Sequence, residues 1–427
     1  MTVNAAGDTI VALSSGRLPA AIAVIRTSGP AALDAAQAVA GKPPAPRRAS
    51  LRSLRNPVDG ALIDRGLVLV FPGPDTATGE DIVEYQCHGS NAVVAALIAA
   101  LVALPGLRIA DPGEFTRRAL FNGRIDLTQA EGLAELLEAE SEAQRISALC
   151  RAEGDLRRQV ERWRSALLEL SAEAEVAIDY ADEEDGGFVF DPSARLAVLI
   201  GALNALLAAP RVERLRDGVR VVVAGPPNAG KSSLVNALAG ETRAIVTATP
   251  GTTRDLVEVP LSLAGIPLTL IDTAGLRETD EEIERIGIGL AEREIERADM
   301  LLWLGAEADL PNHPRVLLVA SKADLSSVGV GHRVSVIDNQ GLGGLNDWIA
   351  SQASELIPSS EQSGMNDREA ELIDKTCQAL LRASTLGDPV FIAEELRLAR
   401  STLDQVSGIT GVEQLLDALF GRFCLGK

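Results

Sequence analysis

The chain has 427 residues, 46% of them apolar, so it is long enough for two or three domains that each bury a core. Its 60 acidic and 40 basic side chains give a net charge of −20, which excludes broad, non-specific nucleic-acid binding but not a local basic patch. The four cysteines are far apart and the amino terminus lacks a basic leader. We therefore expect a cytosolic protein without structural disulfides or a structural zinc site.

Residues 1–120 predict a small α+β domain, because short β-like runs alternate there with one or two helical stretches. We expect strands over residues 21–25 and 67–71, and a turn at residues 111–115 that leads into a helix. The apolar run at 92–104 is too short to span a bilayer, so it predicts a buried helix and no membrane partner. The spacing of the residues in this domain does not by itself indicate a catalytic or binding site.

Two helical stretches surround a part of the chain with a different pattern. The first covers residues 121–217, with a shorter helix expected over 192–208, and the second covers 359–427. Between them, residues 218–358 alternate strand-like and helical runs, which is typical of a parallel α/β sheet. We expect one helical domain with this α/β domain inserted into it. The first stretch carries an apolar stripe of Leu156, Val160, Trp163, Leu167, Leu170, Ala174 and Ala177.

The inserted domain begins with a strand, a glycine-rich loop and a helix, in that order. Residues 221–223 are three valines, which suit a strand buried on both faces. Residues 225–232 then match G-x-x-x-x-G-K-[ST], a loop whose backbone N–H groups wrap a phosphate. Lys231 is expected to reach the outer phosphates and Ser232 to ligate Mg²⁺. The helix that follows offers its positive amino end to the same anion.

Three further motifs support a GTPase. Residues 272–275, Asp-Thr-Ala-Gly, follow a strand at 268–271 and suit Mg²⁺ and a γ-phosphate. Residues 251–255 stand where a first switch loop belongs, with Thr253 as the second Mg²⁺ ligand. Asp324 follows a strand at 315–320 and can accept two N–H bonds from guanine, which disfavours a generic ATPase. The residues expected at the nucleotide are Asn228, Ala229, Gly230, Lys231, Ser232, Ser233, Thr247, Ala248, Thr249, Pro250, Gly251, Thr252, Thr253, Asp272, Thr273, Ala274, Gly275, Ser321, Lys322 and Asp324.

Two positions bear on hydrolysis. Leu276 follows the Asp-Thr-Ala-Gly motif and cannot orient the attacking water, so another group must do so. Glu281, Glu282 and Glu284 are candidates, although such a run also suits a solvated helix start. Asn228 either holds a monovalent cation beside the phosphates or simply forms a turn.

The chain resembles the MnmE family of tRNA-modification GTPases, also called TrmE, over essentially all of its length. The terminal tail is a highly specific match, because an otherwise plain helix ends in the family's C-x-G-K tail. From the sequence alone, this tail would be taken for a frayed end. The matching segments are FPGPDTATGED, HGS, LRIADPGEFTRRALFNGRIDLTQAE, PNAGKSSLVNALAG, AIVTATPGTTRD, IDTAGLRETDEEIERIGI, EELRLA and Cys424-Leu425-Gly426-Lys427.

The resemblance implies a homodimer formed by the amino-terminal domain, which binds 5-formyl-tetrahydrofolate or a related folate. It further implies an FAD-dependent partner, MnmG, in a heterotetramer that modifies carbon 5 of the wobble uridine in certain tRNAs. A G-protein switch for ribosome assembly is the alternative, but such a protein should carry a basic RNA-binding domain. By motif position, Arg26, Glu84, Arg124 and Lys427 would bind the folate, Asn228, Thr247, Thr249 and Thr252 would hold K⁺, and Glu284 would organise the water.

Three positions depart from the family pattern. Ser321 stands in place of an Asn, so a weaker brace is expected between the base site and the phosphate loop. Residues 335–337, Ser-Val-Ile, replace a Ser-Ala-basic loop, which puts the detailed base contacts in question. Arg124 replaces a Lys but keeps its charge. Cys424 matches the family's cysteine, and both a packing role and a chemical role stay open.

Overall fold

The computed structural model describes residues 7–179, 190–241, 243–244, 257–273, 291–325, 330–358, 364–408, 419–421 and 426. The chain divides into two compact units, one of Met1–Ala134 with Ser407–Lys427 and the other of Glu135–Val406. Within the described ranges, no helix combines the length and apolar character needed to cross a membrane.

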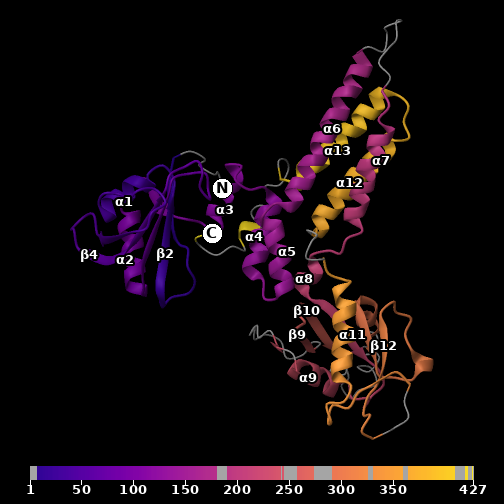
Figure 1. The fold of residues 1–427 in the computed structure, drawn as a ribbon. Helices are drawn as coiled ribbons and strands as arrows, with labels where there is room; N and C mark the ends of the chain where they lie inside the picture. The colour runs from indigo at the N-terminus through magenta and orange to yellow at the C-terminus, as the bar shows by residue number, and fades with distance from the viewer. Residues whose placement is uncertain are drawn as a thin grey trace, which may run out of the picture. The chain divides into compact units, whose positions relative to one another are not determined.

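The first unit is built on a mixed sheet whose described strands have the order β3-β4-β5-β2-β1-β6. Neighbouring strands are antiparallel, except that β1 and β6 are parallel. Helices α1 and α2 pack on this sheet (Figure 1) and bury Val39 and Leu97 in one cluster with Val68 and Tyr85. The elements are β1 (Thr9–Leu13), β2 (Ala20–Ser28), α1 (Ala32–Ala40), β3 (Ser50–Arg55), β4 (Leu62–Phe71), β5 (Ile82–Gly89), α2 (Asn91–Val102), β6 (Leu107–Ile109), α3 (Glu114–Phe121) and α4 (Leu127–Glu138), which leads into the second unit.

Helix α2 accounts for the predicted apolar helix at residues 92–104, with one difference. Ser90 caps its amino end, since the Ser90 side chain accepts a hydrogen bond from the Val93 N–H. Only one face of the helix is buried, through Val94, Leu97, Ala100 and Leu101. The opposite face is exposed and largely alanine, so the predicted buried helix is buried on one side.

The second unit contains a largely parallel sheet whose described strands have the order β13-β12-β11-β7-β10-β9-β8. Only β9 and β8, at one edge, are antiparallel to their neighbours. Strand β7 lies in the middle, and its three valines at 221–223 are fully buried. Because parallel strands end at the same edge, the loops after β7, β10 and β12 meet there. The elements are β7 (Val219–Ala224), α9 (Lys231–Glu241), β8 (Arg243–Ala244), β9 (Val257–Leu263), β10 (Ile266–Asp272), β11 (Met300–Trp303), the 3₁₀ helix η2 (Glu307–Asp309), β12 (Val316–Ala320), β13 (His332–Arg333) and α11 (Leu342–Ser354).

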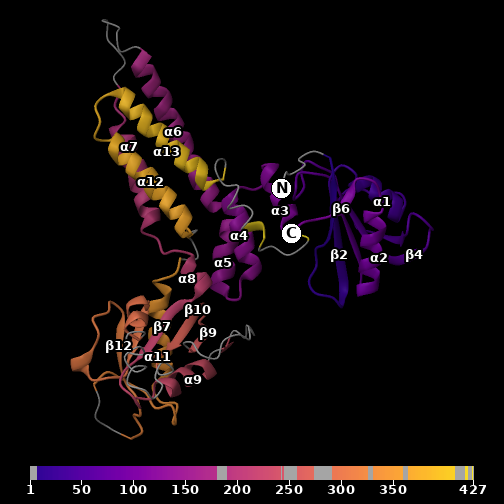
Figure 2. The same ribbon diagram turned by 180° about the vertical axis from the view of Figure 1, so that it is seen from behind.

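Helices before and after this sheet form one bundle, which Figure 2 shows from behind. Residues 156–203 and 365–406 contribute to the same hydrophobic cluster, so the α/β domain is an insertion in a helical domain. The predicted apolar stripe lies on α6 and is buried, apart from the partly buried Trp163. The bundle helices are α6 (Asp155–Asp179), α7 (Ser193–Leu207), α12 (Asp367–Ala383) and α13 (Pro389–Val406). Helix α5 (Glu142–Ala152) precedes α6, and α8 (Glu213–Asp217) buries Leu215 in the core of the inserted domain.

A buried ion pair holds the two points where the chain enters and leaves the inserted domain. Arg151 on α5 and Glu369 on α12 are both fully buried, and their side chains pair at 2.8 Å. The same guanidinium donates to the Gly364 carbonyl oxygen at 2.9 Å. Next to it, the Val212 N–H donates to the Met365 carbonyl oxygen at 3.1 Å. The segments that enter and leave the inserted domain are therefore bonded to each other and to α5.

The fold class predicted from the sequence is confirmed: an α+β amino-terminal domain, a helical bundle and an inserted α/β domain with a phosphate-binding loop. The predicted boundaries at residues 120, 217 and 358 stay predictions. The last described residues of the chain, 407–408, 419–421 and 426, group with the first unit.

Candidate functional site

The phosphate loop follows β7 directly and has positive φ angles, which residues other than glycine rarely adopt. Gly225 has φ +147°, and a Cβ there would lie 3.0 Å from the carbonyl carbon of Leu304. Gly230 and Asn228 also have positive φ, at +94° and +62°. Lys231 opens α9 and is buried, and its ammonium group donates to the Gly225 and Pro226 carbonyl oxygens at 3.0 and 2.9 Å. The loop is thus folded around the lysine that would meet the phosphates.

The first turn of α9 completes this loop. Ser232 and Ser233 are exposed there, at the positive end of the helix. The next strand of the sheet brings in Asp272, which is 5% exposed and stands opposite Val223 in the register of β7 and β10. Thr273 fixes the end of that strand, since its hydroxyl donates to the Val223 carbonyl oxygen at 2.9 Å. Of the predicted phosphate and magnesium residues, the described ones, Lys231, Ser232, Asp272 and Thr273, therefore lie at one edge of the sheet.

The Ser-Lys-Ala-Asp segment after β12 is tied to the same loop by two side chains. The Ser321 hydroxyl donates to the Ala229 carbonyl oxygen at 2.5 Å. The Lys322 ammonium group donates to the Asn228 carbonyl oxygen at 2.8 Å. A weaker connection between the base site and the phosphate loop was expected at Ser321. The structure nevertheless shows a direct hydrogen bond there.

Asp324 is held by the loop that departs from the family pattern. The Ser335 hydroxyl donates to Asp324 Oδ1 at 3.0 Å, and Ser335 is fully buried. In addition, the Ala323 N–H donates to the Val334 carbonyl oxygen at 3.1 Å. Ser335 therefore orients the carboxylate, while Ile337 is 82% exposed.

Several predicted site residues lie outside the described residues. They are Thr247, Ala248, Thr249, Pro250, Gly251, Thr252, Thr253, Ala274, Gly275, Glu284, Cys424 and Lys427. The same applies to Leu276, Glu281 and Glu282.

In the first unit, the structure joins two of the predicted folate residues. Arg26 on β2 and Glu84 on β5 are direct partners in the strand register, and Arg26 Nη2 lies 2.7 Å from Glu84 Oε1. The Arg26 guanidinium also stacks over the Phe115 ring, 5.8 Å from its centroid. Arg124 contacts a different group, because its Nη2 donates to Asp75 Oδ1 at 2.8 Å. Arg26 and Glu84 are thus paired with each other, and Arg124 pairs with Asp75.

The carboxyl-terminal segment docks on this unit. Gly426 is buried with φ +96°, and its carbonyl oxygen accepts a hydrogen bond from the Ser14 hydroxyl at 2.8 Å. Phe420 is 2% exposed and packs with Leu127. Gly426 therefore lies against the end of β1.

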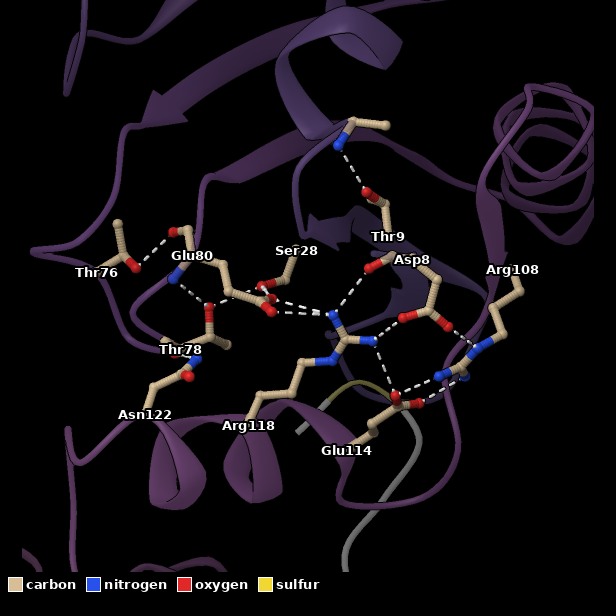
Figure 3. Close-up of polar contacts among 11 residues, drawn as sticks. Asp8, Thr9, Ser28, Thr76, Thr78, Glu80, Arg108, Glu114, Arg118 and Asn122 are labelled. Atoms are coloured by element: carbon tan, nitrogen blue, oxygen red, sulfur yellow. Dashed lines mark hydrogen bonds and ion pairs between the residues drawn. The ribbon is translucent and has the colours of Figure 1, made fainter. Parts of the chain in front are cut away.

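A charged network centred on Arg118 was not predicted from the sequence (Figure 3). Arg118 on α3 contacts Asp8 at 2.8 Å, Glu80 at 3.1 Å and Glu114 at 3.1 Å. Arg108 contacts Asp8 at 2.6 Å and Glu114 at 2.5 Å. Burial alone would raise the pKa of Glu114, but hydrogen bonds from Arg108, the Asp111 N–H and Arg118 hold that pKa below its usual value.

This network fixes the loop that follows β4. Ser28 Oγ donates to Glu80 Oε2 at 2.7 Å, and Asn122 Nδ2 donates to the Thr78 carbonyl oxygen at 2.6 Å. Because the charges satisfy one another, we interpret the network as architecture that positions β2, the 72–81 loop and α3. The available signal was the density of opposite charges in FPGPDTATGED and LRIADPGEFTRRALF.

The chain is similar to known proteins over nearly its full length. The tRNA modification GTPase MnmE of Novosphingobium aromaticivorans is 48% identical and covers 98% of this chain and 100% of its own. The MnmE of Rhizorhabdus wittichii is 49% identical over 99% of this chain and 97% of its own. Among solved structures, the G domain of the T. maritima FeoB iron transporter is 26% identical over 32% of this chain and 98% of its own, with a TM-score of 0.23.

Two family descriptions match the chain in succession. The GTP-binding protein TrmE N-terminus matches residues 9–124, and the MnmE helical domain matches residues 127–424. Together they span both units, and the second alone covers well over half of the chain. The chain therefore belongs to the MnmE family of tRNA modification GTPases.

Proposed function

We propose that this protein hydrolyses GTP and, with the FAD-dependent partner MnmG, modifies carbon 5 of the wobble uridine in certain tRNAs. The observation that carries the proposal is the convergence of the loop at 225–232, Asp272 and Asp324 at one sheet edge. The two side-chain bonds from Ser321 and Lys322 couple the guanine site to the phosphate loop. The closeness of the MnmE relatives supports the tRNA substrate.

GTP and Mg²⁺ fit the described residues. Lys231 already holds two carbonyl oxygens in place of phosphate oxygens, and Ser232 is exposed beside it. Bound Mg²⁺ would neutralise charge on the phosphates, and Ser232 with Thr253 would hold it. Asp272 would contribute through water. Asp324 would accept the guanine N–H groups.

Potassium is proposed as the activating cation. The Asn228 carbonyl oxygen is occupied by Lys322, so the exposed side-chain amide of Asn228 remains to hold a cation. We expect Thr247, Thr249 and Thr252 to complete the site and Glu284 to organise the water. Hydrolysis should be fast in K⁺ and slow in Na⁺, and Asn228→Ala should abolish the difference. Equal rates of the unaltered protein in both salts would contradict the potassium role.

A folate is proposed for the first unit. Its pterin ring needs an acceptor for N–H donors, and its glutamate tail needs cations. Glu84 and Arg26 offer both at 18% and 26% side-chain exposure. The docking of Gly426 on Ser14 supports a site that the terminal Lys427 completes, with Arg124 as a further cation. We expect 5-formyl-tetrahydrofolate to bind and Glu84→Ala to weaken its binding.

A homodimer is proposed through the first unit. Helices α1 and α2 cover one sheet face, but Leu51, Leu67 and Ile22 on the strands are 66%, 38% and 60% exposed. Leu51 and Leu67 are direct register partners, so they lie on one face. An exposed apolar sheet face of this kind supports a second copy as its cover.

The alternative, a ribosome-assembly switch, would not modify the wobble uridine of tRNA. Mass spectrometry of wobble uridines from cells lacking this protein tests the proposal most directly. We expect the carbon-5 modification to be lost and to return with the intact gene. Normal wobble uridines together with a ribosome-assembly defect would favour the alternative.

A further inference from the structure

The amino-terminal part of the chain differs in charge from the rest. Residues 1–124 contain 12 Lys and Arg against 10 Asp and Glu, a net charge of +2, in a chain of net charge −20. Within them, residues 35–58 contain five basic side chains and no acidic one. An anionic polymer is repelled by most of this protein, so it can approach only where the local charge is positive.

The fold places this basic segment along an edge. Strand β3 is the last strand of its sheet and pairs only with β4 among the described strands. Arg52 and Arg55 lie on β3, Arg48 two residues before it, and Lys42 in the loop after α1. We call these four residues the basic edge. Arg52 and Arg55 are three residues apart, so they point to opposite faces of the strand, roughly 10 Å apart.

The basic edge is not neutralised by the protein itself. Within the ranges that the structure describes, none of its four members forms an ion pair. Arg52 and Arg55 donate only to the backbone carbonyl oxygens of Leu51 and Gly60, at 3.2 and 2.9 Å. The fifth cation of the segment, Arg47, is different. It pairs with Asp75 at 3.6 Å and stacks over Phe71 at 5.8 Å, which anchors the start of the edge.

We propose that the basic edge binds the phosphate backbone of the tRNA. This inference rests on the proposed function, in which tRNA is the substrate, and it identifies the surface of the protein that would contact the tRNA. Three of the four cations are arginines, whose planar fork can bond a phosphate through two N–H groups. Such contacts fix position on the RNA and carry no sequence information. Cations on an edge strand also discourage strand-to-strand aggregation, which is the competing explanation.

The test is a binding titration of the full chain with an unmodified tRNA transcript across salt concentrations of about 50 to 200 mM. We compare the unaltered protein with a triple variant, Arg48→Gln, Arg52→Gln and Arg55→Gln. The triple variant should bind roughly tenfold or more weakly at low salt. Its plot of log affinity against log salt should be shallower by about 2 to 3, because each arginine removed leaves one phosphate without its cation.

Two matched variants control for charge and for folding. Arg17→Gln removes an exposed arginine from the β1–β2 loop of the same unit, three strands away from β3, and should change neither quantity. Replacing the three arginines by Lys keeps the charge and should keep the salt slope. GTP hydrolysis, which belongs to the other unit, should be equal in all variants and reports that the chain is folded.

The outcomes separate the two proposals. If the unaltered protein and the triple variant bind tRNA with equal affinity, the basic edge does not bind tRNA, but the proposed role in tRNA modification is unaffected. Unaltered protein that hydrolyses GTP but binds no tRNA would overturn both. Weaker binding of the triple variant to polyglutamate or to anionic lipid vesicles, with tRNA binding unchanged, would assign the edge to another partner. Aggregation of the triple variant at unchanged tRNA affinity would favour the protective role.

Discussion

The Ser321 hydroxyl lies 2.5 Å from the Ala229 carbonyl oxygen and links the loop after β12 to the phosphate loop after β7. The two residues are 92 positions apart in the sequence. A serine is shorter than the asparagine that the family pattern has here, yet it still spans the gap. The hydrogen bond therefore joins the proposed guanine site to the phosphate loop.

Ser321→Ala should weaken GTP binding by roughly 5- to 10-fold, because a single neutral hydrogen bond contributes about 1 kcal/mol. Isothermal titration with GTP and with inorganic triphosphate measures this. Ser321→Asn restores the family residue and should bind GTP at least as well as the unaltered protein. An alanine variant with full affinity for GTP would show that Lys322 alone maintains the link.

Asp324→Asn should change base choice. In the proposed site the carboxylate, which Ser335 orients, would accept N–H groups of guanine, and removing such a charge-assisted bidentate interaction should cost about 2–3 kcal/mol. The variant should bind GTP more weakly and xanthosine triphosphate more tightly, measured by competition with a fluorescent nucleotide. Ser335→Ala keeps the charge and should show a smaller effect. Unchanged GTP affinity in Asp324→Asn would remove this residue from the base site.

Arg151→Met should destabilise the second unit by about 3–5 kcal/mol, because it removes the nearest cation from the fully buried carboxylate of Glu369 and leaves Arg368 at 3.9 Å as its remaining ion-pair partner. Urea unfolding followed by circular dichroism measures the change. The double variant with Glu369→Gln should recover part of the stability, since the two residues interact directly. Arg382→Met breaks an exposed pair with Glu395 and should cost less than about 1 kcal/mol. Equal destabilisation in the two single variants would contradict the role of the buried pair.

Gly426→Ala should undock the carboxyl-terminal tail. Gly426 has φ +96°, and a Cβ there would lie 2.1 Å from the Leu13 carbonyl oxygen, so the present contact with Ser14 cannot be kept. The variant, like deletion of residues 424–427, should lose wobble modification while GTP hydrolysis stays near normal. Gly16→Ala, at an open position of the same unit, is the control. Full wobble modification in Gly426→Ala would mean that the tail does not build the one-carbon site.

The sequence by itself determined the elements and their order. Three consecutive valines at 221–223 indicate a strand that is buried on both faces. The apolar stripe on α6 indicates a helix that packs in a bundle. The phosphate loop was readable for the same reason, because its glycines and its lysine act through local backbone geometry. The assignment of Arg26 and Glu84 to a folate pocket came only from the family resemblance, and their ion pair with each other was not predicted.

The tertiary structure decided what depends on distance across the chain. The bonds of Ser321 to Ala229 and of Ser335 to Asp324, the network around Arg118, and the buried pair of Arg151 with Glu369 join residues that no local pattern relates. It also showed that α2 is buried on one face only, and that Gly426 meets the end of β1. Local preferences act over a few residues, whereas these contacts exist only after separate elements have packed, so a sequence pattern cannot contain them.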